Sequence, residues 1–444
     1  MASLLQKSLF LFLALCCLTQ YTNAHPLKIC KLDQIYQLGD SISDTGNFIR
    51  QIPIETASAF ARLSYGETIF NNATGRCSNG LLIIDHIVKL ETEHVANPSN
   101  RRNQHHTNKP LQNRANTHVL FRPQPRRKKN RRGQCIALPG DTQHPALFSI
   151  YATYSNPSHL LSSFQDQAMA AGLPFVRPYK NMDGHFKHGV NFAVAGSTAL
   201  PSQVLASKHI FCPVTTTSLH VQLEWMFTHF NSICFDHTDC VDKLENALFM
   251  VGEIGGNDYN YAFFQGKTME ELKSMVPDVV ESIMDAAKKV INLGAQRVVI
   301  PGNFPIGCRP IYQTVFQSNI SEAYDENQCL NQFNEFAQYH NEQLQQAIFK
   351  LQQEKPNAIV VYGDYYNAYQ FLLKFAYTSW ACCGTGGKYN FDLKRMCGED
   401  GDVPVCAEPN RYVSWDGVHL TQRGYKIMAA WLLHDIFPKL HCHF

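Results

Sequence analysis

Short apolar runs alternate with amphipathic stretches along the chain from about Val190 onward. Apolar runs that end in Gly or Pro are typical of buried strands, and apolar residues at three- and four-residue spacing are typical of helices. The pattern predicts a strand at 248–251, a helix within 272–296, a strand within 297–308, a helix over 330–354 and a strand over 358–364. Strands separated by helices predict an α/β fold with a parallel, doubly wound sheet, in which ligands bind at the carboxyl ends of the strands.

The segment 89–167, which separates the stretches GRCSNGLLIIDHIV and AMAAGLPFVRPYK, lacks this pattern. It is polar and basic, and Lys and Arg are nearly contiguous from 126 to 132. Loops longer than about 12–15 residues are uncommon inside compact domains. We interpret 89–167 as an insertion of low order in a fold that is complete without it. A patch that binds nucleic acid is the alternative, which the lack of interleaved aromatic residues disfavours.

The N-terminus has the features of a secretory signal peptide. Lys7 precedes a short apolar run, and small residues lead up to Ala24. The run is shorter than the roughly 20 apolar residues of a membrane span, which argues against an N-terminal anchor. We therefore predict a signal peptide over 1–24, a domain over 25–444 and a secreted or vacuolar protein without a membrane span. The net charge of +2 gives no general attraction to nucleic acid or to anionic membranes.

Secretion makes the 15 cysteines interpretable. Cys16 and Cys17 leave with the signal peptide and Cys135 lies in the insertion, so an even number remains. None of the spacings resembles a zinc site, and we expect disulfides, with many pairings possible. Asn72 and Asn319 begin Asn-x-Thr/Ser sequons, so we expect both to carry glycans.

Ser41 stands in the stretch LGDSISDTGN, directly after an apolar run that ends at Leu38. A serine between a strand and the next helix gains electrostatic support, because the unpaired N–H groups of a helix N-terminus stabilise a developing anion. A simple turn is the alternative, since Gly, Asp, Ser and Asn favour turns. The pattern Gly-x-Ser-x-Gly is absent from the sequence, which disfavours an ordinary α/β-hydrolase.

Asp416 and His419 are three residues apart in the stretch WDGVHLT, just before a helical pattern. A serine nucleophile needs an imidazole to take its proton and a carboxylate to fix the imidazole tautomer. One tight turn brings such a pair to the same side of the backbone. A chance pairing is the alternative among 19 histidines, but its combination with the Ser41 motif favours a catalytic triad.

Two motifs between these ends supply candidate donors for an oxyanion. Gly196 follows the apolar run VNFAVA, where its backbone N–H can point into a site. Asn257 follows the predicted strand 248–251, where its side-chain amide can donate a hydrogen bond. A strand-end glycine and a turn asparagine are the alternatives. Loss of one oxyanion donor typically raises a barrier by about 2.7–4 kcal/mol, so such roles would be large.

In this order the four motifs resemble those of the plant GDSL esterase/lipase family within the SGNH hydrolases. The resemblance extends to GNFPIGC, YGDYYNA and CCGTGGKYNF, phrases similar to the subgroup that holds acetylajmalan esterase and sinapine esterase. It implies a three-layer α/β/α sandwich on a parallel, flavodoxin-like sheet. It also implies Ser41 as nucleophile, His419 as general base and Asp416 as orienting acid. The Ser41 N–H, the Gly196 N–H and the Asn257 amide would form the oxyanion hole, and no metal or organic cofactor is implied.

The resemblance implies a small-molecule ester as the substrate, best interpreted as a short acyl, acetyl ester of a plant specialised metabolite such as an acetylated indole alkaloid. Three alternatives remain: an acyltransferase that uses the same site, an esterase of choline or sugar esters, and a binding protein inactivated by the insertion. We expect a monomer that binds no nucleic acid.

Overall fold

The computed structural model describes residues 32–51, 58–88, 173–375, 378–399 and 403–441. The predicted signal peptide and the whole of the predicted insertion at 89–167 lie outside these ranges. Both therefore stay predictions, and so does the division of the chain that depends on them.

A six-stranded parallel sheet forms the centre of the fold, in the order β2-β3-β1-β4-β5-β6. Its strands are β1 (Gln34–Leu38), β2 (Arg177–Pro178), β3 (Val190–Asn191), β4 (Ala247–Val251), β5 (Arg297–Pro301) and β6 (Ile359–Gly363). Apart from the short edge strand β2, this is the flavodoxin order, in which the first strand lies between the second and third. The predicted parallel sheet is confirmed, as are the three strands predicted at 248–251, 297–308 and 358–364.

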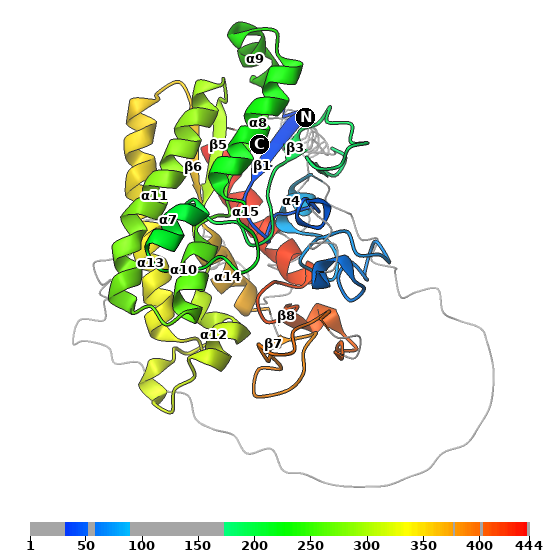
Figure 1. The fold of residues 1–444 in the computed structure, drawn as a ribbon, viewed down its shortest axis with the longest axis vertical. Helices are drawn as coiled ribbons and strands as arrows, with labels where there is room; N and C mark the ends of the chain where they lie inside the picture. The colour runs from blue at the N-terminus through cyan, green and yellow to red at the C-terminus, as the bar shows by residue number, and fades with distance from the viewer. Residues whose placement is uncertain (1–31, 52–57, 89–172, 376–377, 400–402, 442–444) are drawn as a thin grey trace, which may run out of the picture. The chain divides into compact units, whose positions relative to one another are not determined.

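Helices cover both faces of this sheet, which gives three layers (Figure 1). One layer consists of α8 (Leu219–Ile233), α11 (Met269–Asn292) and α13 (Asn331–Glu354). The other consists of α4 (Ile83–Val88), α14 (Tyr365–Leu373) and α15 (Gln422–Lys439). The predicted helices at 272–296 and 330–354 are α11 and α13. The remaining α-helices of the described residues are α7 (Ser202–Ser207), α9 (His237–Leu244), α10 (Gly256–Phe264) and α12 (Pro310–Val315).

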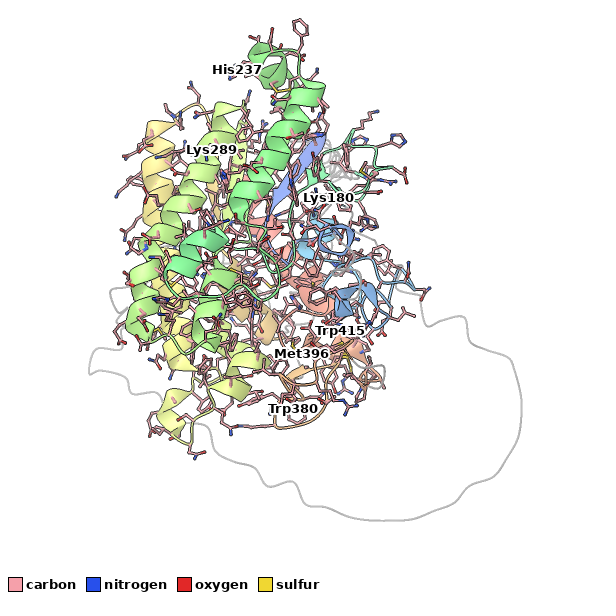
Figure 2. The ribbon with its side chains drawn as sticks, viewed as in Figure 1. Lys180, His237, Lys289, Trp380, Met396 and Trp415 are labelled. Carbon is pink, nitrogen blue, oxygen red and sulfur yellow. A yellow bond between two sulfur atoms is a disulfide. The ribbon has the colours of Figure 1, made fainter. Side chains whose placement is uncertain are left out.

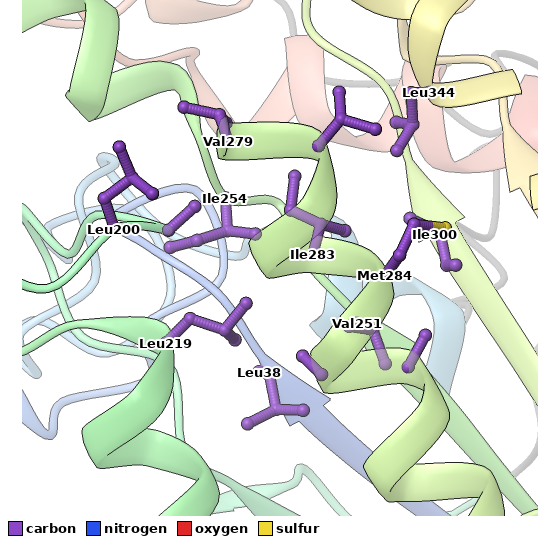
Figure 3. Close-up of a cluster of buried hydrophobic side chains, with 14 of the residues drawn as sticks. Leu38, Leu200, Leu219, Val251, Ile254, Val279, Ile283, Met284, Ile300 and Leu344 are labelled. Atoms are coloured by element: carbon purple, nitrogen blue, oxygen red, sulfur yellow. The ribbon is translucent and has the colours of Figure 1, made fainter. Parts of the chain in front are cut away.

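Helix α11 shows how the sequence pattern produces this packing. It begins at a capping box, in which Thr268 Oγ1 accepts the Glu271 N–H and the Glu271 carboxylate accepts the Thr268 N–H. Its apolar stripe then packs in the main buried cluster, which includes Ile283 of α11 together with Leu38 of β1 and Val251 of β4 (Figure 3). Full burial of each such side chain contributes about 1.5–3 kcal/mol. This apolar layer fixes the strand ends that carry the site described below.

A second, two-stranded parallel sheet pairs β7 (Thr378–Ala381) with β8 (Tyr412–Ser414). Two disulfides lie in this region, Cys382–Cys406 and Cys383–Cys397. Their sulfurs pack in a small apolar cluster with Tyr65 and the fully buried Trp415, which Figure 2 labels.

The expectation of disulfides is confirmed by four bridges. The other two are Cys234–Cys240 and Cys308–Cys329. Among the described residues, Cys77 and Cys212 are unpaired. Within the described ranges, no helix combines the length and the apolar character that crossing a membrane requires.

Candidate active site

Ser41 lies on a turn, three residues beyond the end of β1. The expectation of a helix start at Ser41 is wrong, because 39–47 consists of turns and bends and the next helical segment is the 3-10 helix η1 (Phe48–Arg50). Asp40 shapes this turn: its carboxylate accepts the Ile42 N–H at 3.0 Å and its carbonyl accepts the Asp44 N–H at 2.9 Å. Polar side chains here capture N–H groups that a helix N-terminus leaves free.

The buried carboxylate of Asp44 joins this turn to the segment of Gly196. It accepts hydrogen bonds from four backbone N–H groups, those of Gly46 at 2.7 Å, Asn47 at 2.6 Å, Phe48 at 3.0 Å and Ala195 at 2.9 Å. Burial raises the pKa of Asp44, and the four N–H groups oppose that rise. Since Ala195 directly precedes Gly196, one side chain fixes the distance between two of the predicted site segments.

Helix α8 holds the same turn from another direction. The buried Gln222 accepts the Gly39 N–H through Oε1 at 2.8 Å and donates from Nε2 to the Gly39 carbonyl at 2.7 Å. The Asp40 N–H donates to the carbonyl of Glu253, which follows β4, at 2.8 Å. The residues before Ser41 are therefore fixed to both α8 and the end of β4.

Asn257 lies in the first turn of α10, beyond the end of β4. Its Nδ2 atom donates to the Ser197 carbonyl at 3.0 Å and to Asp40 Oδ2 at 3.4 Å. It therefore bridges the turn of Ser41 and the loop of Gly196. The three predicted oxyanion donors come together at the carboxyl ends of the neighbouring strands β1, β3 and β4, as expected for a doubly wound sheet.

Gly196 occupies a position that suits only glycine. Its φ of +81° is in the left-handed region, and an added Cβ would lie 2.5 Å from Val214 Cγ1. Its carbonyl accepts the Tyr261 hydroxyl at 2.7 Å. A few residues after Gly196, the N–H groups of Ala199 and Leu200 donate to the Asp258 carboxylate.

Asp416 and His419 lie between β8 and α15 and contact each other directly. His419 Nδ1 is 2.6 Å from Asp416 Oδ2, and Asp416 Oδ1 accepts the N–H groups of Val418 and His419 at 2.9 and 2.7 Å. Burial alone would raise the pKa of Asp416, because it favours the protonated acid. The charge of His419 and these hydrogen bonds have the larger effect and lower the pKa of Asp416 to about 2. A buried carboxylate on Nδ1 leaves Nε2 as the nitrogen that can accept a proton.

Asp40, the residue before Ser41, is within the electrostatic influence of His419. Burial raises the pKa of Asp40 to about 6, while the Ile42 N–H and the nearby charges of Arg309 and His419 lower it. His419 is thus within electrostatic reach of the residue that precedes Ser41. No hydrogen bond joins Ser41 to His419 in the described part of the chain, although catalytic hydrogen bonds often tighten only when substrate binds.

Two aromatic residues that the sequence analysis missed complete the surroundings of this pair. The Tyr65 hydroxyl donates to Asp416 Oδ2 at 2.8 Å, and both side chains are buried. The Phe60 ring meets the His419 ring edge-on, with centroids 5.7 Å apart. Tyr65 and Asp416 are 351 residues apart, so no local pattern indicates their contact.

The structure also shows where the predicted glycan acceptors lie, although their glycosylation stays a prediction. Asn72 and Asn319 are both exposed, as glycan acceptors must be. Only one group among the described residues has the spacing of metal ligands: Cys308, Asp325 and Cys329. Its two sulfurs are bonded to each other, which removes the thiolates that a metal would need.

Comparison with known proteins identifies the family of the chain. The sequence profile of the GDSL-like Lipase/Acylhydrolase family matches residues 149–432, a range that includes Gly196, Asn257, Asp416 and His419. A GDSL esterase/lipase of Arabidopsis thaliana is 51% identical over 258 residues, which cover 57% of this chain and 79% of the relative.

Two further relatives match nearly the whole chain. Acetylajmalan esterase 2 of Rauvolfia serpentina is 35% identical over 423 residues, 94% of this chain and 93% of the relative. A second Arabidopsis thaliana GDSL esterase/lipase is 36% identical over 445 residues, 98% of this chain and 93% of the relative. The chain is therefore a carboxylic ester hydrolase that belongs to the GDSL esterase/lipase family.

Proposed function

We propose that the chain is a secreted serine carboxylesterase with Ser41 as its nucleophile. His419 Nε2 takes the Ser41 proton, and Oγ attacks the ester carbonyl. Asp416 holds the imidazole in the required tautomer and stabilises the imidazolium. The 2.6 Å contact between His419 Nδ1 and Asp416 Oδ2, two buried side chains, is the observation that carries this proposal.

In the proposed reaction, the oxyanion accepts hydrogen bonds from the Ser41 N–H, the Gly196 N–H and the Asn257 amide. The tetrahedral intermediate collapses to an acyl-enzyme, and the alcohol leaves with the proton from His419. A water molecule that His419 activates then attacks the acyl group and releases the acid. The residues that fix the donors, Asp44 and Asp258, are bound to backbone N–H groups on both sides of Gly196, which supports a pre-organised oxyanion site.

For the substrate we propose a short acyl ester of a small plant metabolite, best interpreted as an acetylated indole alkaloid. Support comes from the relative named acetylajmalan esterase 2, which is 35% identical over most of both chains. The four disulfides support an oxidising, extracytoplasmic location, and with it glycans at Asn72 and Asn319. The monomeric state and the lack of nucleic-acid binding belong to the same proposal.

Replacement of the triad tests this function. We expect Ser41→Ala to lower kcat for p-nitrophenyl acetate by several orders of magnitude, with circular dichroism and Tm close to those of wild type. His419→Ala should match it, and the double variant should be little worse, because the two residues act as a unit. Near-wild-type turnover in Ser41→Ala would assign the nucleophile elsewhere, with Ser43 and Ser197 as the next candidates.

Wild-type kcat/KM for an acetylated indole alkaloid, sinapoylcholine, an acetylated sugar and triolein then ranks the substrate classes in the same experiment. The proposal expects the acetylated alkaloid to exceed triolein, and the reverse order contradicts it.

A further inference from the structure

Arg309 is a buried cation without a direct partner. Its exposed fraction is 7%, and its guanidinium lies over the Phe304 ring, 4.5 Å from the centroid. It makes no hydrogen bond and no ion pair with any residue that the structure describes, and its Nε atom is fully buried and unsatisfied. Burial of an unpaired charge is costly, so such a group is rare unless a ligand completes it.

The backbone places Arg309 beside the acid–base loop. It immediately precedes α12, and the N–H of Ile311 donates to the carbonyl of Gly417 at 3.1 Å. Gly417 is the residue that follows Asp416. The segment of Arg309 is therefore fixed to the loop that carries the proposed general base.

The charge of Arg309 also acts on the other half of the site. Its charge lowers the pKa of Asp40, the residue before Ser41, and that of Glu253. Neither carboxyl lies within 4.0 Å of the guanidinium among the ion pairs of the described residues. The oxygens of Asp40 accept hydrogen bonds from the Ile42 N–H and the Asn257 amide instead. The buried guanidinium thus belongs to a segment fixed to the acid–base loop, its charge acts on Asp40, and its hydrogen-bond donors have no acceptor among the described residues.

We propose that Arg309 binds a carboxylate of the substrate, so that the site selects small esters with an anionic group near the ester bond. This inference rests on the proposed esterase function and names its substrate class more closely. A guanidinium presents parallel N–H donors that match the two oxygens of a carboxylate. Phe304 and the Gly417 contact hold the group in place before binding. A substrate that meets both proposals is an alkaloid ester that also carries a carboxylate, with its protonated amine away from Arg309.

Paired substrates of equal shape test the proposal. Wild type, Arg309→Met and Arg309→Lys are assayed with 4-acetoxybenzoate and 3-acetoxybenzoate, and with the two uncharged benzamides of the same geometry. We expect Arg309→Met to lower kcat/KM for the better benzoate at least tenfold more than for its benzamide. Arg309→Lys keeps the charge but loses the parallel donors, so it should keep only part of this ratio. An equal loss on both members of a pair, or no loss on either, overturns the proposal.

Binding to the intact wild-type protein gives a second measurement that no folding defect can affect. By calorimetry, the product 4-hydroxybenzoate should bind at least tenfold more tightly than 4-hydroxybenzamide, and equal affinities overturn the proposal. The two hypotheses fail separately. Wild-type protein that hydrolyses none of the four esters contradicts the esterase function, whereas hydrolysis without a preference for the anion contradicts only the role of Arg309.

Discussion

The turn that carries Ser41 and the loop that carries Asp416 and His419 differ in what holds them. Buried side chains fix the turn to the main sheet and α8: Asp44 binds four backbone N–H groups, and Gln222 binds both polar groups of Gly39. These bonds need no covalent cross-link. They form as soon as the strands and α8 pack, so this half of the site depends on the large core.

The acid–base loop lies outside that sheet and depends on a cross-linked lobe. Cys382 and Cys383 donate from their N–H groups to the carbonyls of Ser414 and Trp415, at 3.1 and 2.7 Å, directly before Asp416. Each of these cysteines forms a disulfide across 24 or 14 residues. The comparison teaches that packing and hydrogen bonds stabilise the turn of Ser41, whereas the acid–base loop also depends on two disulfide bonds. The predictions that follow act on one half at a time.

Asp44→Asn should have the largest effect. Each carboxylate oxygen of Asp44 accepts two N–H groups, and in Asn an NH₂ group replaces one of these oxygens. Because NH₂ is itself a donor, two of the four N–H groups lose their acceptor. We expect the free energy of unfolding to fall by about 2–4 kcal/mol and kcat to fall about 100-fold or more, measured by urea unfolding and ester hydrolysis. The control is Asp236→Asn at the exposed start of α9, where the carboxylate caps the helix by accepting one N–H, which the amide oxygen can still accept. Comparable kcat values for the two variants would contradict the role of Asp44.

Removal of the Cys383–Cys397 disulfide should have an intermediate effect. We expect Cys383→Ala with Cys397→Ala to lower stability by about 2–4 kcal/mol and to lower kcat about tenfold, because the loop before Asp416 gains freedom. The matched control removes Cys234–Cys240, which joins the end of α8 to α9. That pair should leave kcat near wild type. Equal losses of kcat in both double variants would mean that the lobe does not position the acid–base loop specifically.

Tyr65→Phe should have the smallest effect. Asp416 keeps its contacts with His419 and with two backbone N–H groups, so only one hydrogen bond, worth about 0.5–1.5 kcal/mol, is lost. We expect kcat/KM to fall about threefold to tenfold with KM nearly unchanged.

The Tyr65 experiment also includes a test of mechanism. Asp416 loses a donor to its ionised form, so its pKa should rise from about 2 and the acid limb of the pH–rate profile should shift. The control is Tyr425→Phe, which removes another buried hydroxyl, one that makes no hydrogen bond with Asp416 or His419 among the described residues. An unaltered pH profile in Tyr65→Phe would reduce Tyr65 to a packing residue.

The sequence predicted those features whose signals are local. Strands β4, β5 and β6 and helices α11 and α13 follow from periodicity within each segment, and Asp416 and His419 are close because they are three residues apart. The prediction of a helix start at Ser41 was wrong, because the carboxylates of Asp40 and Asp44 accept backbone N–H groups of this segment and stabilise a turn instead. Tyr65 and Arg309 could not be found, since their surroundings come from segments far apart in the chain. The roles of the site residues stay predictions.

The site joins the first and last strands that the structure describes, β1 and β8. During synthesis, the turn after β1 emerges early, whereas the residues that activate its serine emerge more than 370 positions later. With the roles proposed for Ser41 and His419, a truncated chain therefore carries a nucleophile without its base. The cysteines that support the base must also be oxidised before it is held in place. With the roles proposed above, full hydrolytic activity develops only after translation and disulfide formation are complete.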